Sequence, residues 1–126
     1  MADFFAKETI KSLRKLRQLK PDYFKGFMDW DQMIFKDGAL PAKTKELMAV
    51  TAAHVTACPW CIEDHVKRAI KQGATDEEIA EAAFVAMALR AGAAFAHSSI
   101  AMAVSDEQRK SAAEAHPHEG HEGHNH

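Results

Sequence analysis

The chain has 126 residues, of which 47% are hydrophobic and 27% charged, and its formal net charge is −2. This composition is too apolar for a disordered chain, and the length suits a single domain. The balanced charge lacks a basic run, so we expect no nucleic-acid partner. Charges interrupt both residues 1–19 and the apolar stretch at 79–104, so we expect no secretory signal and no membrane partner, and predict a cytoplasmic protein.

Helical patterns recur along the first half of the chain, and no segment alternates in the way of a strand. Residues 3–19 place apolar side chains near one side of a first helix. Pro21 suits the first turn of a second helix, which Asp37-Gly38 ends because glycine accepts the left-handed conformation found at helix ends. Pro41 opens a third helix that runs to about Thr56.

The second half of the chain is also predicted to be helical. Gly73 ends a fourth helix, and Thr75 with Glu78 forms a capping box that starts the next one. We expect helix from there to residue 104 with a break or kink near Gly92, then a short helix over 106–115. The fold class is therefore all-α, with a helical domain at 1–115 and a disordered tail at 116–126.

Two of these helices are apolar around their whole circumference. The stretch LMAVTAAHVTA that follows Glu46 holds no charge, and residues 79–104 are similarly apolar and contain many alanines. A helix that is apolar on every side must be buried on every side, and a chain of this length has a limited interior. We therefore expect an oligomer in which other subunits cover part of this surface.

The only two cysteines of the chain stand in the segment TACPWCIEDH. Pro59 fits the first turn of a helix, which makes Cys58 its N-cap, and Cys61 and His65 then fall with Cys58 within an arc of ~60°. The charged residues of this helix, Arg68 among them, are expected on the opposite side, facing water. A helix N-terminus and a nearby imidazolium both stabilise a thiolate, which is the form that attacks a peroxide or a disulfide.

Two other interpretations of the cysteine pair remain open. Cys58, Cys61 and His65 supply three of the four ligands that zinc prefers, and His54 or a histidine of the tail could complete the set. The cysteines could also be buried without any chemistry. His54 and His97 lie in apolar helices and are more often satisfied core histidines than ligands.

Residues 40–102 resemble the core of the AhpD-like alkylhydroperoxidases, within the carboxymuconolactone decarboxylase family. Glu46, Cys58, Cys61 and His65 match the family's motif, which is Glu, then CxxC, then xxx-His. The resemblance implies that Cys61 attacks the hydroperoxide and becomes a sulfenic acid. It also implies that Cys58 donates a proton and then forms the disulfide, while Glu46 and His65 relay protons.

The resemblance also implies an all-helical bundle that assembles as a homotrimer or homohexamer. The expected partners are a hydroperoxide substrate and a dithiol reductant or a peroxiredoxin-type redox partner, with no cofactor and no metal in the site. Trp60 departs from the pattern, since well-known peroxidase members carry histidine just before the second cysteine. A slower or differently partnered thiol oxidoreductase therefore stays open, whereas decarboxylation is not expected, because the decarboxylases of the family lack the CxxC.

Two expectations from the residues themselves remain to be reconciled with this resemblance. The helix start favours the thiolate at Cys58, whereas the family assigns the attack to Cys61. Glu46 would lie ~18 Å from Cys58 along one straight helix, so the two can meet only if the chain folds back at 56–59 or another subunit contributes. Glu46 could otherwise be a solvated carboxylate in a first helical turn.

The tail HPHEGHEGHNH holds five of the eight histidines of the chain. Histidines at flexible spacing bind Ni²⁺, Zn²⁺ or Cu²⁺, and the composition cannot form a packed core. The alternative function is therefore a non-enzymatic metal-binding or metal-delivery protein that uses this tail.

Overall fold

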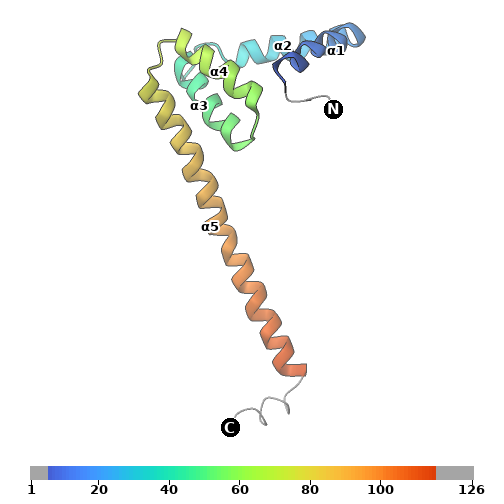
Figure 1. Cartoon of the computed structure of the whole chain (residues 1–126), viewed down its shortest axis with the longest axis vertical. Coiled ribbons are helices and arrows are strands. Elements are labelled where there is room, and N and C mark those ends of the chain that lie inside the picture. The colour runs from blue at the N-terminus through green and yellow to red at the C-terminus, as the bar shows by residue number, and fades with distance from the viewer. Residues whose placement is uncertain (1–5, 116–126) are drawn as a thin grey trace. The chain divides into compact units, whose positions relative to one another are not determined.

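The structure is a computed structural model that describes residues 6–115. No strand is present in that range, so the all-α prediction is confirmed. A short 3₁₀ helix comes first and five α-helices follow (Figure 1). These elements are η1 (Lys7–Ser12), α1 (Leu13–Leu19), α2 (Pro21–Ile34), α3 (Ala42–Val55), α4 (Pro59–Lys71) and α5 (Asp76–Ala115). The predicted tail at 116–126 lies outside the described residues.

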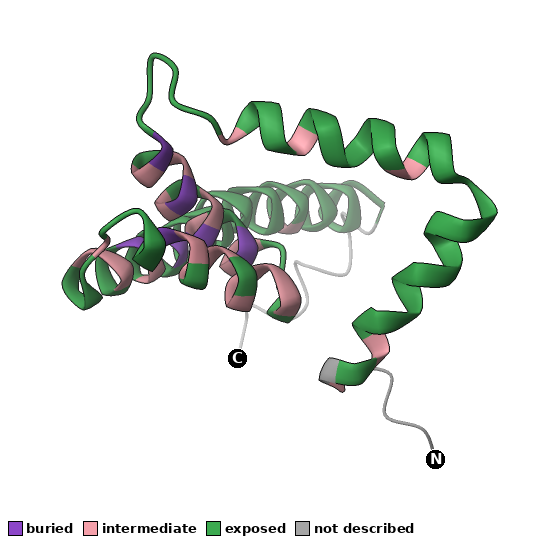
Figure 2. Ribbon diagram, turned by 90° about the horizontal axis from the view of Figure 1, so that it is seen from above, coloured by how far each residue is buried: buried purple, intermediate pink, exposed green. Residues whose placement is uncertain are grey.

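The chain divides into two compact units, Met1–Met87 and Ala88–His126. The buried residues of the first unit lie on α3, α4 and the start of α5, whereas α1 and α2 are exposed along almost their whole length (Figure 2). Most of the buried apolar side chains are alanines, which allow helices to approach closely, and Val50 is the largest that is fully buried. The buried apolar residues are Ala42, Val50, Ala53, Ala69, Ala82 and Ala86.

Polar contacts fasten the start of α5 to α3. The hydroxyl of Thr51 donates a hydrogen bond of 2.8 Å to the carbonyl oxygen of Ala82, and Lys43 forms an ion pair of 2.8 Å with Glu78. The capping box forms as predicted, because the Glu78 carboxylate accepts from the Thr75 amide at 2.9 Å and the Thr75 hydroxyl accepts from the Glu78 amide at 3.2 Å.

Side chains complete the junction between α2 and α3. Lys45 donates from Nζ to the carbonyl oxygens of Ile34 and Lys36, at 2.8 and 2.7 Å, and so satisfies acceptors that the end of α2 leaves open. Asp37 Oδ1 accepts a hydrogen bond of 2.7 Å from the amide of Ala42, the first residue of α3. The predicted stop at Asp37-Gly38 lies three to four residues after Ile34, the last residue of α2.

Two predicted helices differ from the structure. The helix expected over 3–19 is η1 followed by α1 in the described part, and its apolar side chains at Ile10, Leu13 and Leu16 are exposed. The break expected near Gly92 and the separate helix expected over 106–115 are both wrong, since α5 continues through them. A glycine costs a helix about 1 kcal/mol but keeps its N–H group, and the surrounding alanines offset that cost.

Much of the apolar surface of α5 is open in the single chain. Phe84 and Phe95 are 65% and 82% exposed. By length and composition α5 could cross a membrane, yet a core helix of a soluble protein passes the same test. The absence of a membrane partner therefore stays a prediction, as does the covering of this surface by other subunits.

Candidate active site

The chain reverses direction between α3 and α4 through a tight turn. The amide of Ala57 donates to the carbonyl oxygen of His54 at 3.3 Å, and the amide of Cys58 donates to that of Ala53 at 3.0 Å. This is the hydrogen-bond pattern of a Schellman motif, with Ala57 in the left-handed conformation at φ 56°. That conformation costs an L-residue other than glycine roughly 1 kcal/mol, so the turn before the cysteines is strained.

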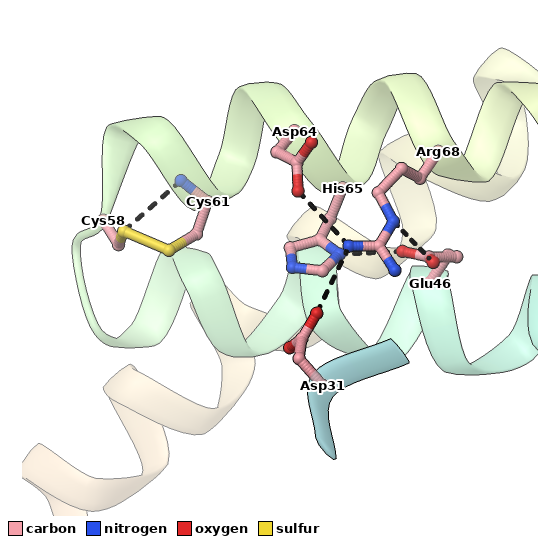
Figure 3. Close-up of polar contacts among 7 residues, drawn as sticks. All are labelled: Asp31, Glu46, Cys58, Cys61, Asp64, His65 and Arg68. Carbon is pink, nitrogen blue, oxygen red and sulfur yellow. Dashed lines mark hydrogen bonds and ion pairs between the residues drawn. A yellow bond between two sulfur atoms is a disulfide. The ribbon is translucent and has the colours of Figure 1, made fainter. Parts of the chain in front are cut away.

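The two cysteines lie at the start of α4 and form a disulfide (Figure 3). Cys58 is the N-cap, as predicted, and its sulfur accepts a hydrogen bond of 3.3 Å from the amide of Cys61. Pro59 begins the helix and loses no hydrogen bond there, because the first amides of a helix have no partner within it. Both cysteines are half-buried, and their Cα atoms are 5.3 Å apart.

Glu46 and His65 meet because α3 and α4 fold back on each other. The Oε2 atom of Glu46 lies 2.7 Å from Nδ1 of His65, and Glu46 is only 4% exposed. The imidazole lies between the disulfide and this carboxylate (Figure 3). The contact places the proton of a neutral imidazole on Nδ1 and leaves Nε2 as the basic nitrogen. Of the two alternatives, a chain that folds back at 56–59 or a contribution from another subunit, the structure shows the fold-back, and the interpretation of Glu46 as a solvated carboxylate is wrong.

Arg68 also binds Glu46, although its charge predicts a side chain that faces water. Its Nε lies 3.0 Å from Oε1 of Glu46. Its Nη1 lies 3.3 Å from Asp64 and 3.9 Å from Asp31, a residue of α2. The buried carboxylate therefore has a charged or hydrogen-bonding partner at each of its oxygens, His65 at Oε2 and Arg68 at Oε1, which is what a charge in the protein interior requires.

Phe35 packs against both partners of the carboxylate. Its ring lies 4.9 Å from the His65 ring and 4.6 Å from the guanidinium carbon of Arg68. The position of Arg68 was available from the sequence, because seven residues at 100° each place it about 20° from Cys61 on the helix. Its charge led to the prediction that it faces water, and that prediction is wrong.

A pocket of about 560 Å³ opens beside the second cysteine. Cys61 and His65 line it, whereas Cys58 does not. Its apolar wall comes from η1, α1, α2 and Trp60. The lining residues are Ile10, Leu13, Phe27, Met28, Asp31, Trp60, Cys61, Glu63, Asp64, His65, Lys67 and Arg68.

Comparison with known proteins identifies the family. The profile of the carboxymuconolactone decarboxylase family matches residues 21–104. The chain belongs to the carboxymuconolactone decarboxylase family. The family match contains Glu46, Cys58, Cys61 and His65, whereas η1 and α1 precede it.

Members of this family and other relatives are similar over most of the chain. The "uncharacterized protein 4 in cox locus" of Paracoccus denitrificans is 47% identical over 107 residues, which cover 85% of this chain and 96% of that protein. A carboxymuconolactone decarboxylase family protein of Legionella pneumophila is 38% identical with a TM-score of 0.61, over 66% of this chain and 74% of that one.

A third similar protein of the same family comes from Thermotoga maritima. It is 35% identical with a TM-score of 0.52, over 70% of this chain and 91% of that one. Involvement in an antioxidative response has been suggested for that protein.

The remaining candidate residues lie apart from the family's motif. Nδ1 of His54 lies 2.8 Å from the carbonyl oxygen of Val50, so this histidine is satisfied within its own helix. His97 belongs to the unit Ala88–His126, where it is exposed. Within residues 6–115, no three histidine, cysteine or acidic side chains are grouped so that they could hold a metal ion. Metal binding by the tail at 116–126 stays a prediction.

Proposed function

We propose that this chain is an alkylhydroperoxidase-like thiol–disulfide oxidoreductase that reduces hydroperoxides through Cys58 and Cys61. One observation carries the proposal. The Cys58–Cys61 disulfide stands at a helix N-terminus, one turn from an imidazole that a buried carboxylate holds in place. A dithiol that closes into a disulfide, with an oriented base beside it, is the minimum required for two-electron reduction of a peroxide.

The pocket favours Cys61 as the attacking thiol, because Cys61 lines it and Cys58 does not. Residues four apart on a helix have Cβ atoms about 5–6 Å apart, so Nε2 of His65 can take the proton of reduced Cys61. The Cys61 thiolate attacks the terminal oxygen of the hydroperoxide and breaks the O–O bond. Cys61 becomes a sulfenic acid, and the alkoxide that leaves takes the proton of the Cys58 thiol to give the alcohol.

The second step closes the disulfide. The Cys58 thiolate attacks the sulfur of the sulfenic acid, and the hydroxide that leaves takes the proton held by His65, so that water forms and the imidazole is neutral again. Glu46 accepts the Nδ1 hydrogen bond throughout and stabilises the imidazolium between the two steps. An external dithiol, or a peroxiredoxin-type partner, then supplies two electrons and two protons through disulfide exchange.

The suggested role of the Thermotoga maritima relative in an antioxidative response supports the same proposal. Trp60 lines the pocket beside Cys61, in the position where histidine stands in well-known peroxidase members, so turnover with the natural reductant is expected to be slower than theirs.

We also propose that the chain assembles as a homotrimer or homohexamer. Large apolar side chains on α5, such as Phe84, Leu89 and Phe95, are at least 60% exposed in the single chain. Apolar surface of that extent is typical of subunit interfaces. Light scattering at micromolar concentration should give three or six chains, and a monomer would contradict the proposal.

Single cysteine variants test the proposed chemistry. Reduced Cys58→Ser should consume about one equivalent of an organic hydroperoxide and stop as a sulfenic acid, which a dione reagent traps. Cys61→Ser should consume almost none. The reverse result would make Cys58 the attacking thiol, as the electrostatics of the helix start favour. If the wild type and both variants leave the hydroperoxide unconsumed, the peroxidase function is contradicted.

A further inference from the structure

The pocket that Cys61 lines is also lined by a segment that the family match leaves out. The match begins at residue 21, whereas Ile10 of η1 and Leu13 of α1 line the pocket. Their exposed fractions are 40% and 45%, lower than the 54% and 66% of Leu16 and Leu19 on the same helix as Leu13. Phe27 and Met28 of α2 continue this wall. Apart from Asp31, the residues of η1, α1 and α2 that line the pocket are therefore apolar.

The charged side chains of the pocket already pair with one another. Lys67 lies 3.0 Å from Glu63, and Arg68 lies 3.3 Å from Asp64 and 3.9 Å from Asp31. Arg68 also holds Glu46. Lys67 and Arg68 thus both have carboxylate partners. They are outnumbered by the three carboxylates that line the pocket, which are Asp31, Glu63 and Asp64. An anionic ligand would have to displace one of these partners or lie beside an uncompensated negative charge.

We propose that this pocket takes an uncharged, apolar organic hydroperoxide, and that Ile10 and Leu13 determine the preference. The inference rests on the proposed function, because the bound molecule is the oxidant that Cys61 reduces. An apolar body gains free energy in proportion to the area that it buries against Ile10, Leu13, Phe27 and Met28. Hydrogen peroxide has no such body, so it reacts at Cys61 without help from this wall.

Three oxidants separate the contributions of size and charge. They are cumene hydroperoxide, the same molecule with a para-carboxylate, and hydrogen peroxide. The measured quantity is the second-order rate constant for thiol loss in the reduced full-length protein. We expect the wild type to react about tenfold faster with cumene hydroperoxide than with its carboxylate, because one buried charge without a partner outweighs the shared apolar contacts.

The variant Ile10→Ser/Leu13→Ser tests the wall itself. It should react about tenfold more slowly with cumene hydroperoxide, while the rate constant for hydrogen peroxide stays within twofold of the wild type. The matched control is Leu16→Ser/Leu19→Ser, which removes two leucines of α1 that do not line the pocket and should leave all three rate constants unchanged.

The outcomes distinguish this inference from the function on which it rests. Equal loss with cumene hydroperoxide and hydrogen peroxide, or equal wild-type rates for cumene hydroperoxide and its carboxylate, would overturn the inference alone. A wild-type protein that consumes none of the three oxidants would overturn the proposed function and this inference with it.

Discussion

Two turns of the same construction differ in the residues that build them. The turn from α3 to α4 and the turn from α4 to α5 both end their first helix with a Schellman motif. In the second, the amide of Gly73 donates to the carbonyl oxygen of Ile70 and the amide of Ala74 to that of Ala69, each at 2.9 Å. The left-handed position is occupied by Gly73 at φ 90° in that turn and by Ala57 at φ 56° in the first.

The helix start that follows the first turn is also capped less favourably than the one that follows the second turn. Thr75 and Glu78 form a reciprocal capping box at the start of α5. At the start of α4 the N-cap is Cys58, whose sulfur is a weaker acceptor than an oxygen. Glycine is the residue that best accepts the left-handed position, and threonine is one of the favoured N-cap residues; the first turn uses neither.

This difference indicates that the chain has the less stable turn at the candidate active site. The first turn carries the disulfide and leads to His65, whereas the second turn only connects two helices. Strained or weakly capped positions persist at functional sites when the surrounding structure holds them. Three predictions compare the two turns, first in reaction rate, then in the free energy of unfolding, and last in the pH dependence of stability.

The largest expected effect concerns the proton relay behind the first turn. His65→Ala should slow the reaction of the reduced protein with hydroperoxide about 100-fold, because Cys61 loses its base. Its pH dependence should move upward, toward that of an ordinary thiol near pH ~8.5. Glu46→Gln should slow the reaction in the same direction without changing the oligomer, since an amide supports an imidazolium less well than a carboxylate does.

The second turn supplies the control for this prediction. Glu78→Gln makes the same change from carboxylate to amide at the start of α5, and it should leave the rate constant unchanged. Wild-type rates in both His65→Ala and Glu46→Gln would reduce the cysteines to a plain dithiol and remove the relay from the mechanism.

A smaller effect is expected on stability when the two left-handed residues are exchanged. Ala57→Gly should raise the free energy of unfolding by about 0.5–1 kcal/mol, because relief of the left-handed strain exceeds the added entropy of the unfolded chain. Gly73→Ala should lower it by a similar amount; a Cβ atom there would meet nothing within 4 Å, so only the backbone conformation matters.

Urea unfolding of the reduced proteins measures both changes against the wild type. Shifts of equal sign in the two variants would mean that the turns are not related in the way proposed. No change in Ala57→Gly would mean that the first turn is not strained in solution.

The smallest effect is a pH dependence of stability at the second turn. The hydrogen bond from Lys43 lowers the pKa of Glu78, and the backbone hydrogen bond at Thr75 lowers it further. A carboxyl group whose pKa is lower in the folded state stabilises the fold above its unfolded pKa, near ~4.3, and loses that contribution as the pH falls through its folded pKa. The wild type should therefore be slightly more stable than Glu78→Gln at pH 7, and the difference should vanish in acid. A difference that persists at low pH would contradict this origin.

Local signals in the sequence predicted most of the fold. Pro21 begins α2, Gly73 follows α4, and Thr75 caps α5, because each of these residues has a backbone or side-chain property that only a helix end uses. The break expected near Gly92 is wrong, because one glycine weakens a helix without removing a hydrogen bond. Helix ends were thus predictable at residues that favour a helix end, such as Pro21 and Thr75. They were not predictable from Gly92, which a helix can also contain in its interior.

The site was predictable in composition but not in arrangement. Spacing along one helix placed Cys58, Cys61 and His65 together, while the contact of Glu46 with His65 depends on how α3 packs on α4. Arg68 was misplaced for a related reason. A long charged side chain is usually solvated. Only the packing of α3 on α4 shows that the buried carboxylate of Glu46 lies next to Arg68.

Titration of the free thiols tests the central claim most directly. The fully reduced wild-type protein should show two reactive thiols, the number of cysteines in the chain. After one equivalent of cumene hydroperoxide it should show none, and peptide mapping should find Cys58 joined to Cys61 within one chain. Two thiols that survive the oxidant, or a disulfide that joins different chains, would contradict a hydroperoxidase that works through this pair.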